Sequence, residues 1–275
     1  MAVEKRTMDG VEIAYRIAGE AGARPIVLIH GLTANMRDWF SNVKPLAEAG
    51  WRVLTPDCPG HGNSSAPDEP CAYAMTQVAD RLHALAVELG FAPAVLVGHS
   101  MGGAIAEEYA IRHGADVSAL VLLDSAGGKP RPVAPDARLK ALIAIERRIA
   151  FEQGMEAVWD FHQEHAMWAS AAQAPPAVQE MLKTRFCSVS PRGYVYGDEA
   201  LGARRDTLPA LARFGKKALV ICGENEAAAL KTAADELAAA IAGARRETIA
   251  RSWHSPHFEN APAFNATLLD FLKRL

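Results

Sequence analysis

The chain has 275 residues, half of them hydrophobic, and a formal net charge of −3. This size suits one large α/β domain or two small ones, and the dispersed charges of both signs predict no binding to nucleic acid or to a membrane surface. No secretory signal and no apolar run of membrane-spanning length is visible. Because the four cysteines show neither C-x-x-C nor metal-ligand spacing, we expect a cytoplasmic protein that holds no metal.

The first 125 or so residues alternate strand patterns with helix patterns, as in a mostly parallel sheet. Asp9-Gly10 is a turn signal between two short extended segments. Continuous apolar runs, typical of strands covered on both faces, follow at 25–29, 51–54, 94–97 and 119–123. Helical patterns lie between them, near 36–48, 75–89 and 101–113.

This rhythm breaks after Asp124. The next convincing strand, 218–222, comes more than ninety residues later, whereas a crossover between parallel strands needs only about 30 residues. The intervening segment has helical patterns broken by prolines. We therefore predict a core domain formed by residues 1–127 and 214–275. Residues 128–213 are predicted to be a helical cap inserted over the carboxyl edge of the sheet, where open α/β sheets bind ligands. The strands on either side of this cap, 119–123 and 218–222, should then be parallel neighbours.

The segment Gly98-His99-Ser100-Met101-Gly102 joins a strand pattern to an amphipathic helix pattern. A serine on such a tight turn exposes its Oγ, and the turn is strained unless small residues lie two positions to either side. Gly98 and Gly102 meet this demand, which makes Ser100 the candidate nucleophile. The alternative is a glycine-rich turn that binds a phosphate.

Several motifs along the chain resemble those of the α/β-hydrolase superfamily, in its cap-bearing esterase and C–C hydrolase branch. They are His30-Gly31, the stretch 57–64, the Ser100 turn, Gly223-Glu224-Asn225-Glu226 and the stretch 254–259. The resemblance covers the whole chain and implies an α/β-hydrolase fold, with a mostly parallel central sheet flanked by helices and an inserted cap. It also implies a catalytic serine, acid and histidine in that chain order.

The resemblance places the catalytic base at His254, five residues before Glu259. A serine hydroxyl needs such a base, because it is a poor nucleophile until an imidazole accepts its proton. His257 is the alternative base, or a residue that lines the pocket. Family members commonly have glycine where this chain has Trp253, a difference that changes the steric freedom of the loop.

The catalytic acid must hold the imidazole in the productive tautomer. Glu226 occupies the family's acid position, in the loop after the strand 218–222, where aspartate is more usual. A glutamate reaches one methylene further and can do the same. The rival is Asp124, at the end of the preceding strand, which could instead cap a loop. We interpret Glu224 as a solvated loop acid.

Two main-chain N–H groups must stabilise the negative charge that develops on the substrate oxygen. By the family pattern they belong to Met101, directly after the nucleophile, and to Leu32, in a loop that follows a central strand. We interpret His30 and His61 as residues that fix their loops by hydrogen bonds, and His99 as a packed residue that points away from the nucleophile.

Aromatic, methionine and histidine side chains of the predicted cap could roof an acyl pocket or bury the cap helices against one another, and both interpretations stay open. They are Phe151, Met155, Trp159, Phe161, His162, His165, Met167 and Trp168.

These observations predict a serine hydrolase that cleaves a small or medium carboxylic ester, with a small-molecule acyl substrate and no cofactor. A C–C bond hydrolase would want a basic residue near a substrate carboxylate, which Lys183, Arg185 or Arg192 could supply. A lactonase has the same motifs, and a ligand-binding protein without turnover is a further alternative. The sequence implies no particular oligomeric state.

Overall fold

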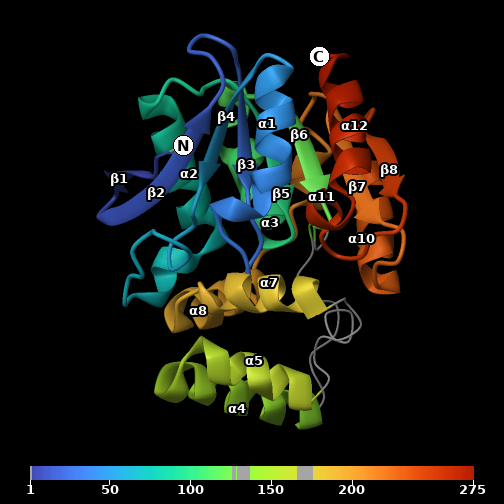
Figure 1. Ribbon diagram of the computed structural model, residues 1–275. Helices are drawn as coiled ribbons and strands as arrows, with labels where there is room; N and C mark the ends of the chain where they lie inside the picture. The colour runs from blue at the N-terminus through green and yellow to red at the C-terminus, as the bar shows by residue number, and fades with distance from the viewer. Residues whose placement is uncertain (1, 126–127, 129–136, 166–175) are drawn as a thin grey trace.

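The computed structural model describes residues 2–125, 128, 137–165 and 176–275, with the backbone alone at 176–178 (Figure 1). In this part of the chain one sheet has the strand order β1-β2-β4-β3-β5-β6-β7-β8. β2 pairs antiparallel with both β1 and β4, and the remaining pairs are parallel. The strands are β1 Glu4–Met8, β2 Val11–Ala18, β3 Arg24–Ile29, β4 Trp51–Pro56, β5 Ala94–His99, β6 Val117–Leu123, β7 Ala218–Gly223 and β8 Arg245–Ile249.

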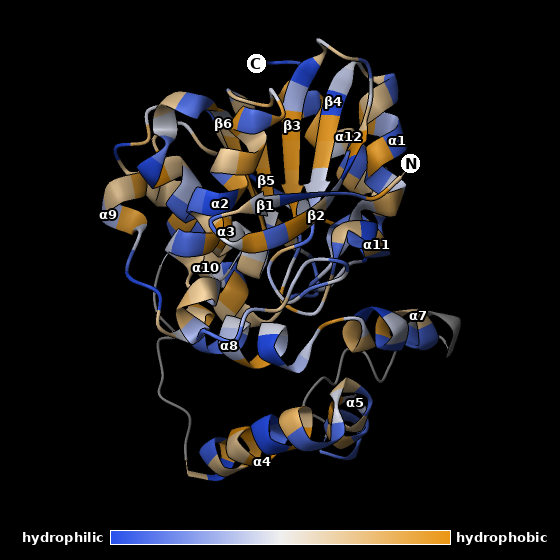
Figure 2. Ribbon diagram, turned by 90° about the vertical axis from the view of Figure 1, so that its left-hand side faces the viewer, coloured by the Kyte–Doolittle hydropathy of each residue, from blue (hydrophilic) through white to orange (hydrophobic). Residues whose placement is uncertain are grey.

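Helices cover both faces of the sheet, which confirms the predicted α/β architecture (Figure 1). They are η1 Met36–Trp39, α1 Phe40–Glu48, η2 Pro70–Tyr73, α2 Met75–Glu88, α3 Met101–Arg112, η3 Gly114–Asp116, α10 Ala228–Ala240, α11 Pro256–Glu259 and α12 Ala261–Leu272. On β3, Val27 belongs to the apolar cluster of α2, α3 and α10, whereas Leu28 belongs to the cluster of α1 and α12. The central strands are continuously apolar because both faces are buried (Figure 2).

The strands on either side of the long insertion are parallel neighbours, as predicted. Leu120 of β6 is in register with Ala218 of β7, and Leu123 with Ile221. Helix α10 ends at Ala240, before the alanine-rich stretch 227–244 does. The chain leaves the helix at Ile241, which has an extended backbone, and then turns at Gly243 with a φ of 73°.

The described residues between β6 and β7 are largely helical and lie beyond the carboxyl ends of the strands (Figure 1). Their helices are α4 Ala137–Gln153, α5 Met155–Glu164, α7 Pro176–Cys187, α8 Pro191–Gly202 and α9 Leu208–Leu211. We call α7 and α8, which lie next to the core, the inner cap layer. We call α4 and α5, which lie further from the sheet, the outer cap layer. None of the helices described is both long and apolar enough to cross a membrane.

The inner cap layer contacts the core through main-chain atoms of the loop after β4. The Ser190 N–H donates to the Gly60 carbonyl over 2.8 Å. A Cβ at Gly193 would lie only 2.4 Å from the same carbonyl oxygen, so α8 can approach this closely only with glycine there. The outer cap layer packs on the inner one through an apolar cluster that includes Trp159, Phe186 and Tyr194.

Candidate active site

Ser100 lies on the turn between β5 and α3 with a φ of 53°, in the left-handed region. Its N–H donates to the Leu123 carbonyl over 2.9 Å, which anchors the turn to β6. A Cβ at Gly98 would lie 2.2 Å from the Gly102 carbonyl oxygen, and one at Gly102 would lie 2.3 Å from the Ile29 carbonyl oxygen. Only glycine fits at either position, which is the physical reason for the two glycines around the serine.

The structure brings Ser100, His254 and Glu226 together from three separate loops. The Ser100 hydroxyl lies 3.0 Å from His254 Nε2, to which it donates a hydrogen bond. His254 Nδ1–H donates to Glu226 Oε2 over 2.5 Å. His254 follows β8 and Glu226 follows β7, so parallel strands deliver both side chains to the same edge of the sheet as Ser100.

The pKa values of this histidine and acid are shifted toward their charged forms. Burial opposes the charge on each group, but the hydrogen bond and mutual attraction outweigh it. The pKa of His254 is raised and the pKa of Glu226 is lowered. Glu226 therefore stays an anion at neutral pH, and it favours the imidazolium that forms when His254 accepts a proton.

The other acids and the other histidine considered for this site have different hydrogen-bond partners. Asp124 is buried at the end of β6, where Oδ1 accepts the Gly223 N–H over 3.1 Å. Burial raises the pKa of Asp124 to about 7. Glu224 accepts the Arg251 N–H, and the His257 ring is bonded to Asp38. Of the two candidate acids, Glu226 is the one within hydrogen-bonding distance of the His254 ring.

Leu32 and Met101 lie on neighbouring segments beside Ser100. β3 and β5 are parallel neighbours, so the loop that carries Leu32 and the turn that carries Met101 leave the sheet side by side. A Cβ at Gly31 would lie 3.3 Å from Ser100 Cβ, which shows how closely the two segments approach. Met101 is the first residue of α3, a position whose N–H has no partner within the helix. This placement is compatible with the predicted pair of N–H donors.

His30 and His61 form the expected loop contacts. His30 Nδ1–H donates to the Gly31 carbonyl over 2.8 Å, and Nε2 accepts the Cys58 N–H over 2.9 Å. The His61 ring nitrogens lie 2.8 and 2.7 Å from the carbonyl oxygens of Pro59 and Leu32. Burial lowers the pKa of both imidazoles to about 4, so they are poor proton carriers at neutral pH.

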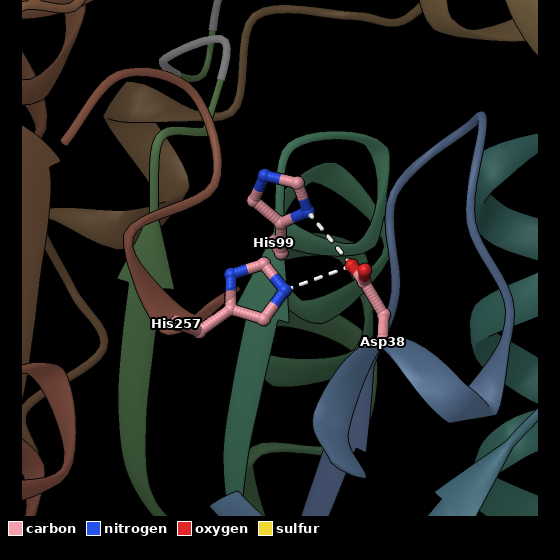
Figure 3. A group of neighbouring side chains, drawn as sticks. All are labelled: Asp38, His99 and His257. Atoms are coloured by element: carbon pink, nitrogen blue, oxygen red, sulfur yellow. Dashed lines mark hydrogen bonds and ion pairs between the residues drawn. The ribbon is translucent and has the colours of Figure 1, made fainter. Parts of the chain in front are cut away.

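A buried polar cluster behind His254 was not predicted from the sequence. It consists of Asp38, His99 and His257 (Figure 3), with Arg185 of the inner cap layer bonded to the Asp38 carboxylate. Within the described residues, the first three form the one group whose donor atoms are close enough for a metal ion. The guanidinium already bonded to Asp38 opposes the binding of a dication there. Asp38 and His257 are more than 200 residues apart in sequence, and no local pattern links them.

In the cap, the aromatic side chains contact one another. Trp159 lies with its ring 5.7 Å from that of Phe186. His162 Nε2–H donates to Glu146 over 2.7 Å, and the Tyr194 hydroxyl donates to the same carboxylate. These contacts support the packing interpretation for Trp159 and His162. Two further cap candidates, Met167 and Trp168, lie outside the described residues.

The fold and the arrangement at the carboxyl edge of its sheet define a hydrolase of the α/β class. A sequence model of the alpha/beta hydrolase family matches residues 26–267, and the chain belongs to this family.

Solved structures of similar fold include an enol-lactonase from Burkholderia xenovorans LB400. It is 30% identical, with a TM-score of 0.84 over 98% of this chain and 100% of that one. A thermophilic esterase from Thermogutta terrifontis is 23% identical and shares the fold, with a TM-score of 0.85 over 100% of this chain and 99% of that one.

Among curated proteins, a non-heme chloroperoxidase from Kitasatospora aureofaciens is 39% identical over 39% of this chain and 38% of its own length. Epoxide hydrolase A from Mycobacterium tuberculosis is 34% identical over 46% of this chain and 39% of its own length. The chain thus spans about two fifths of the length of these curated relatives.

Proposed function

We propose that the protein is a serine hydrolase that cleaves small or medium carboxylic esters. The observation that carries this proposal is the continuous hydrogen-bonded series from the Ser100 hydroxyl through both nitrogens of His254 to Glu226. A nucleophile bonded to a base, which is in turn oriented by an acid, is the arrangement that activates a hydroxyl for attack on a carbonyl.

In the proposed mechanism, Ser100 Oγ attacks the ester carbonyl carbon while His254 Nε2 takes the hydroxyl proton. The N–H groups of Leu32 and Met101 stabilise the oxyanion of the tetrahedral intermediate. His254 then gives its proton to the leaving alcohol, and an acyl-enzyme remains. Water attacks this ester with His254 again as base, which releases the carboxylic acid and restores Ser100.

Lactones are the second candidate class of substrate. The reason is the enol-lactonase relative, which is 30% identical to this chain over nearly its whole length. A lactone is a cyclic ester, so the same steps apply and the alcohol stays attached to the acyl group.

The C–C hydrolase alternative receives less support, because each cap base considered for a substrate carboxylate is paired with a protein carboxylate. The pairs are Lys183 with Glu156, Arg185 with Asp38, and Arg192 with Asp68. A ligand-binding role without turnover is also less favoured, since the acid, base and serine are all in bonding positions.

A substrate panel tests the proposal. Purified protein should hydrolyse nitrophenyl esters of graded acyl length, and Ser100→Ala should reduce turnover by about 10⁴-fold or more. A simple lactone and a ring-cleavage dienoate in the same panel separate the three substrate classes. Hydrolysis of the dienoate alone would replace the ester proposal, and turnover that survives in Ser100→Ala would remove the proposed nucleophile.

A further inference from the structure

The Asp38 carboxylate is the centre of the buried cluster behind His254, and it has a cationic partner from the cap. Its side chain is fully buried. Arg185 Nη1, from α7, donates to Oδ1 over 2.5 Å, and His257 Nε2–H, from α11, donates to Oδ2 over 2.8 Å. Burial alone would raise the pKa of Asp38, but the charge of Arg185 and the hydrogen bond from His257 hold it well below its ordinary value.

His99 connects this cluster to the proposed base. Its Nε2 lies 2.6 Å from the main-chain carbonyl oxygen of His254, and a carbonyl only accepts, so the proton of the ring is on Nε2. Nδ1 is buried without a hydrogen-bond partner and faces Asp38 Oδ2 at 3.9 Å, beyond bonding distance. His99 directly precedes the nucleophile in the sequence. Its neutral ring therefore holds the backbone of His254 through the Nε2–H hydrogen bond.

The second ring of the cluster, His257, donates its Nε2–H to Asp38. Its Nδ1 is buried without a partner, so a second proton there would be an unsatisfied donor. The His99 ring lies 5.1 Å from the ring of His254 and 4.6 Å from that of His257. A charge on the His99 ring would oppose the positive charge that His254 gains when it takes the serine proton.

We propose that Arg185 is a positioning residue for His254: by neutralising Asp38 from the cap, it keeps His99 uncharged and hydrogen-bonded to the His254 carbonyl. The inference rests on the proposed function for the role of His254. Without Arg185, the Asp38 charge would attract a proton to His99 Nδ1, which faces it. The resulting imidazolium would stand beside the base and discourage its protonation.

The charged and titratable groups around the two rings come from several elements. Arg185 is contributed by α7, Asp38 by η1 and His254 by the loop after β8. His30, after β3, interacts with Asp38 and Arg185, and Glu259, at the end of α11, interacts with His254 and His257. Among these groups, Arg185 is the one that the cap contributes.

The test compares Arg185→Met with the wild type by histidine-selective NMR and by the pH profile of ester hydrolysis. We expect that His99 does not titrate between about pH 6 and 9 in the wild type, whereas it does in Arg185→Met. The His99 signal is assigned from its loss in His99→Gln. The kcat of Arg185→Met should fall about tenfold or more at pH 7 and approach the wild-type value at pH 9, where the new imidazolium loses its proton.

Three variants serve as controls. Arg185→Lys keeps the charge and should keep the wild-type profile. The double variant Arg185→Met with Asp38→Asn removes both charges and should lose the extra titration, even if Arg185→Met alone folds poorly. Arg192→Met removes an exposed ion pair between cap and core, the one with Asp68, and should change neither readout.

A loss of activity that is equal at every pH would assign Arg185 a merely structural role and overturn the inference. So would the absence of any new histidine titration in Arg185→Met, as expected if Asp38 itself takes the proton. The NMR result does not depend on turnover. A wild-type protein that hydrolyses no ester would contradict the proposed function, while the NMR titration would still decide whether Arg185 keeps His99 neutral.

Discussion

The core and the cap contribute to the candidate active site in different ways. From the core come Ser100, His254 and Glu226, each in a loop that directly follows a strand of one sheet. The inner cap layer is held to the core by main-chain contacts at Gly60 and by buried and exposed ion pairs, and the outer cap layer packs mainly on the inner one. The core therefore holds the three proposed catalytic side chains on one packed sheet, whereas the cap covers them and contributes none of the three.

Changes in the core should consequently lower kcat, and changes in the cap should alter KM or pH dependence more than the chemical step. The largest loss of kcat is expected for a substitution at Glu226. Glu226→Gln keeps the shape of the acid but favours the wrong tautomer of His254, and kcat should fall by about 10⁴. Steady-state kinetics and thermal unfolding measure the loss and show that the fold is kept. A fall of tenfold or less would exclude Glu226 as the orienting acid.

The pH dependence of kcat/KM tests the roles of His254 and Glu226. His254 must be neutral to take the serine proton, so kcat/KM should fall as the pH drops through its raised pKa, above the ordinary histidine value of about 6.5. In Glu226→Gln the anion that raises this pKa is gone, and the acidic limb of the residual activity should move to lower pH. A limb that stays in place, or moves upward, would show that another group controls it.

A smaller effect is expected where the cap meets the core. A methyl group at position 193 would press on the Gly60 main chain, so Gly193→Ala should displace α8, destabilise the protein by about 1–3 kcal/mol and raise KM more than it lowers kcat. Gly202→Ala is the matched control, because it lies in the same helix and a Cβ there meets nothing within 4 Å. Equal behaviour of the two variants in kinetics and thermal unfolding would contradict this account of the contact.

The smallest effect on activity is expected at the rival acid. Asp124→Asn should leave kcat within about tenfold of the wild type, since the amide oxygen can still accept the Gly223 N–H. The folded-state pKa of Asp124, about 7, exceeds its unfolded value of about 3.9, so the wild type loses stability as the pH rises between these values. Asp124→Asn avoids that loss, so the Tm of the variant relative to that of the wild type should be higher at pH 8 than at pH 5. A large fall in kcat would instead make Asp124 the orienting acid.

The sequence predicted the core much better than the cap. Apolar runs and turn signals are local, so the strands, the Ser100 turn and the pairing of β6 with β7 followed from short segments and general rules of α/β folds. His254 and Glu226 were placed by resemblance and by chain order. The cap helices carry aromatic residues on several faces, and periodicity alone could not decide which of them face one another.

The cluster around Asp38 could not be predicted at all. Its members come from η1, β5, α7 and α11, and what unites them is a shared buried charge, not a spacing in the sequence. Lys183, Arg185 and Arg192 look alike in the sequence as cationic cap residues. Of the three, Arg185 reaches a buried carboxylate, while the other two pair with exposed acids.

Covalent labelling tests the central claim most directly. A fluorophosphonate reacts with a serine only when a neighbouring base activates its hydroxyl, so the wild-type protein should gain one adduct, located at Ser100 by peptide mass spectrometry. Ser100→Ala should gain none, and Glu226→Gln should react far more slowly. An adduct on another residue of the wild type, or an enzyme that hydrolyses esters without being labelled, would contradict the assignment of Ser100 as the nucleophile.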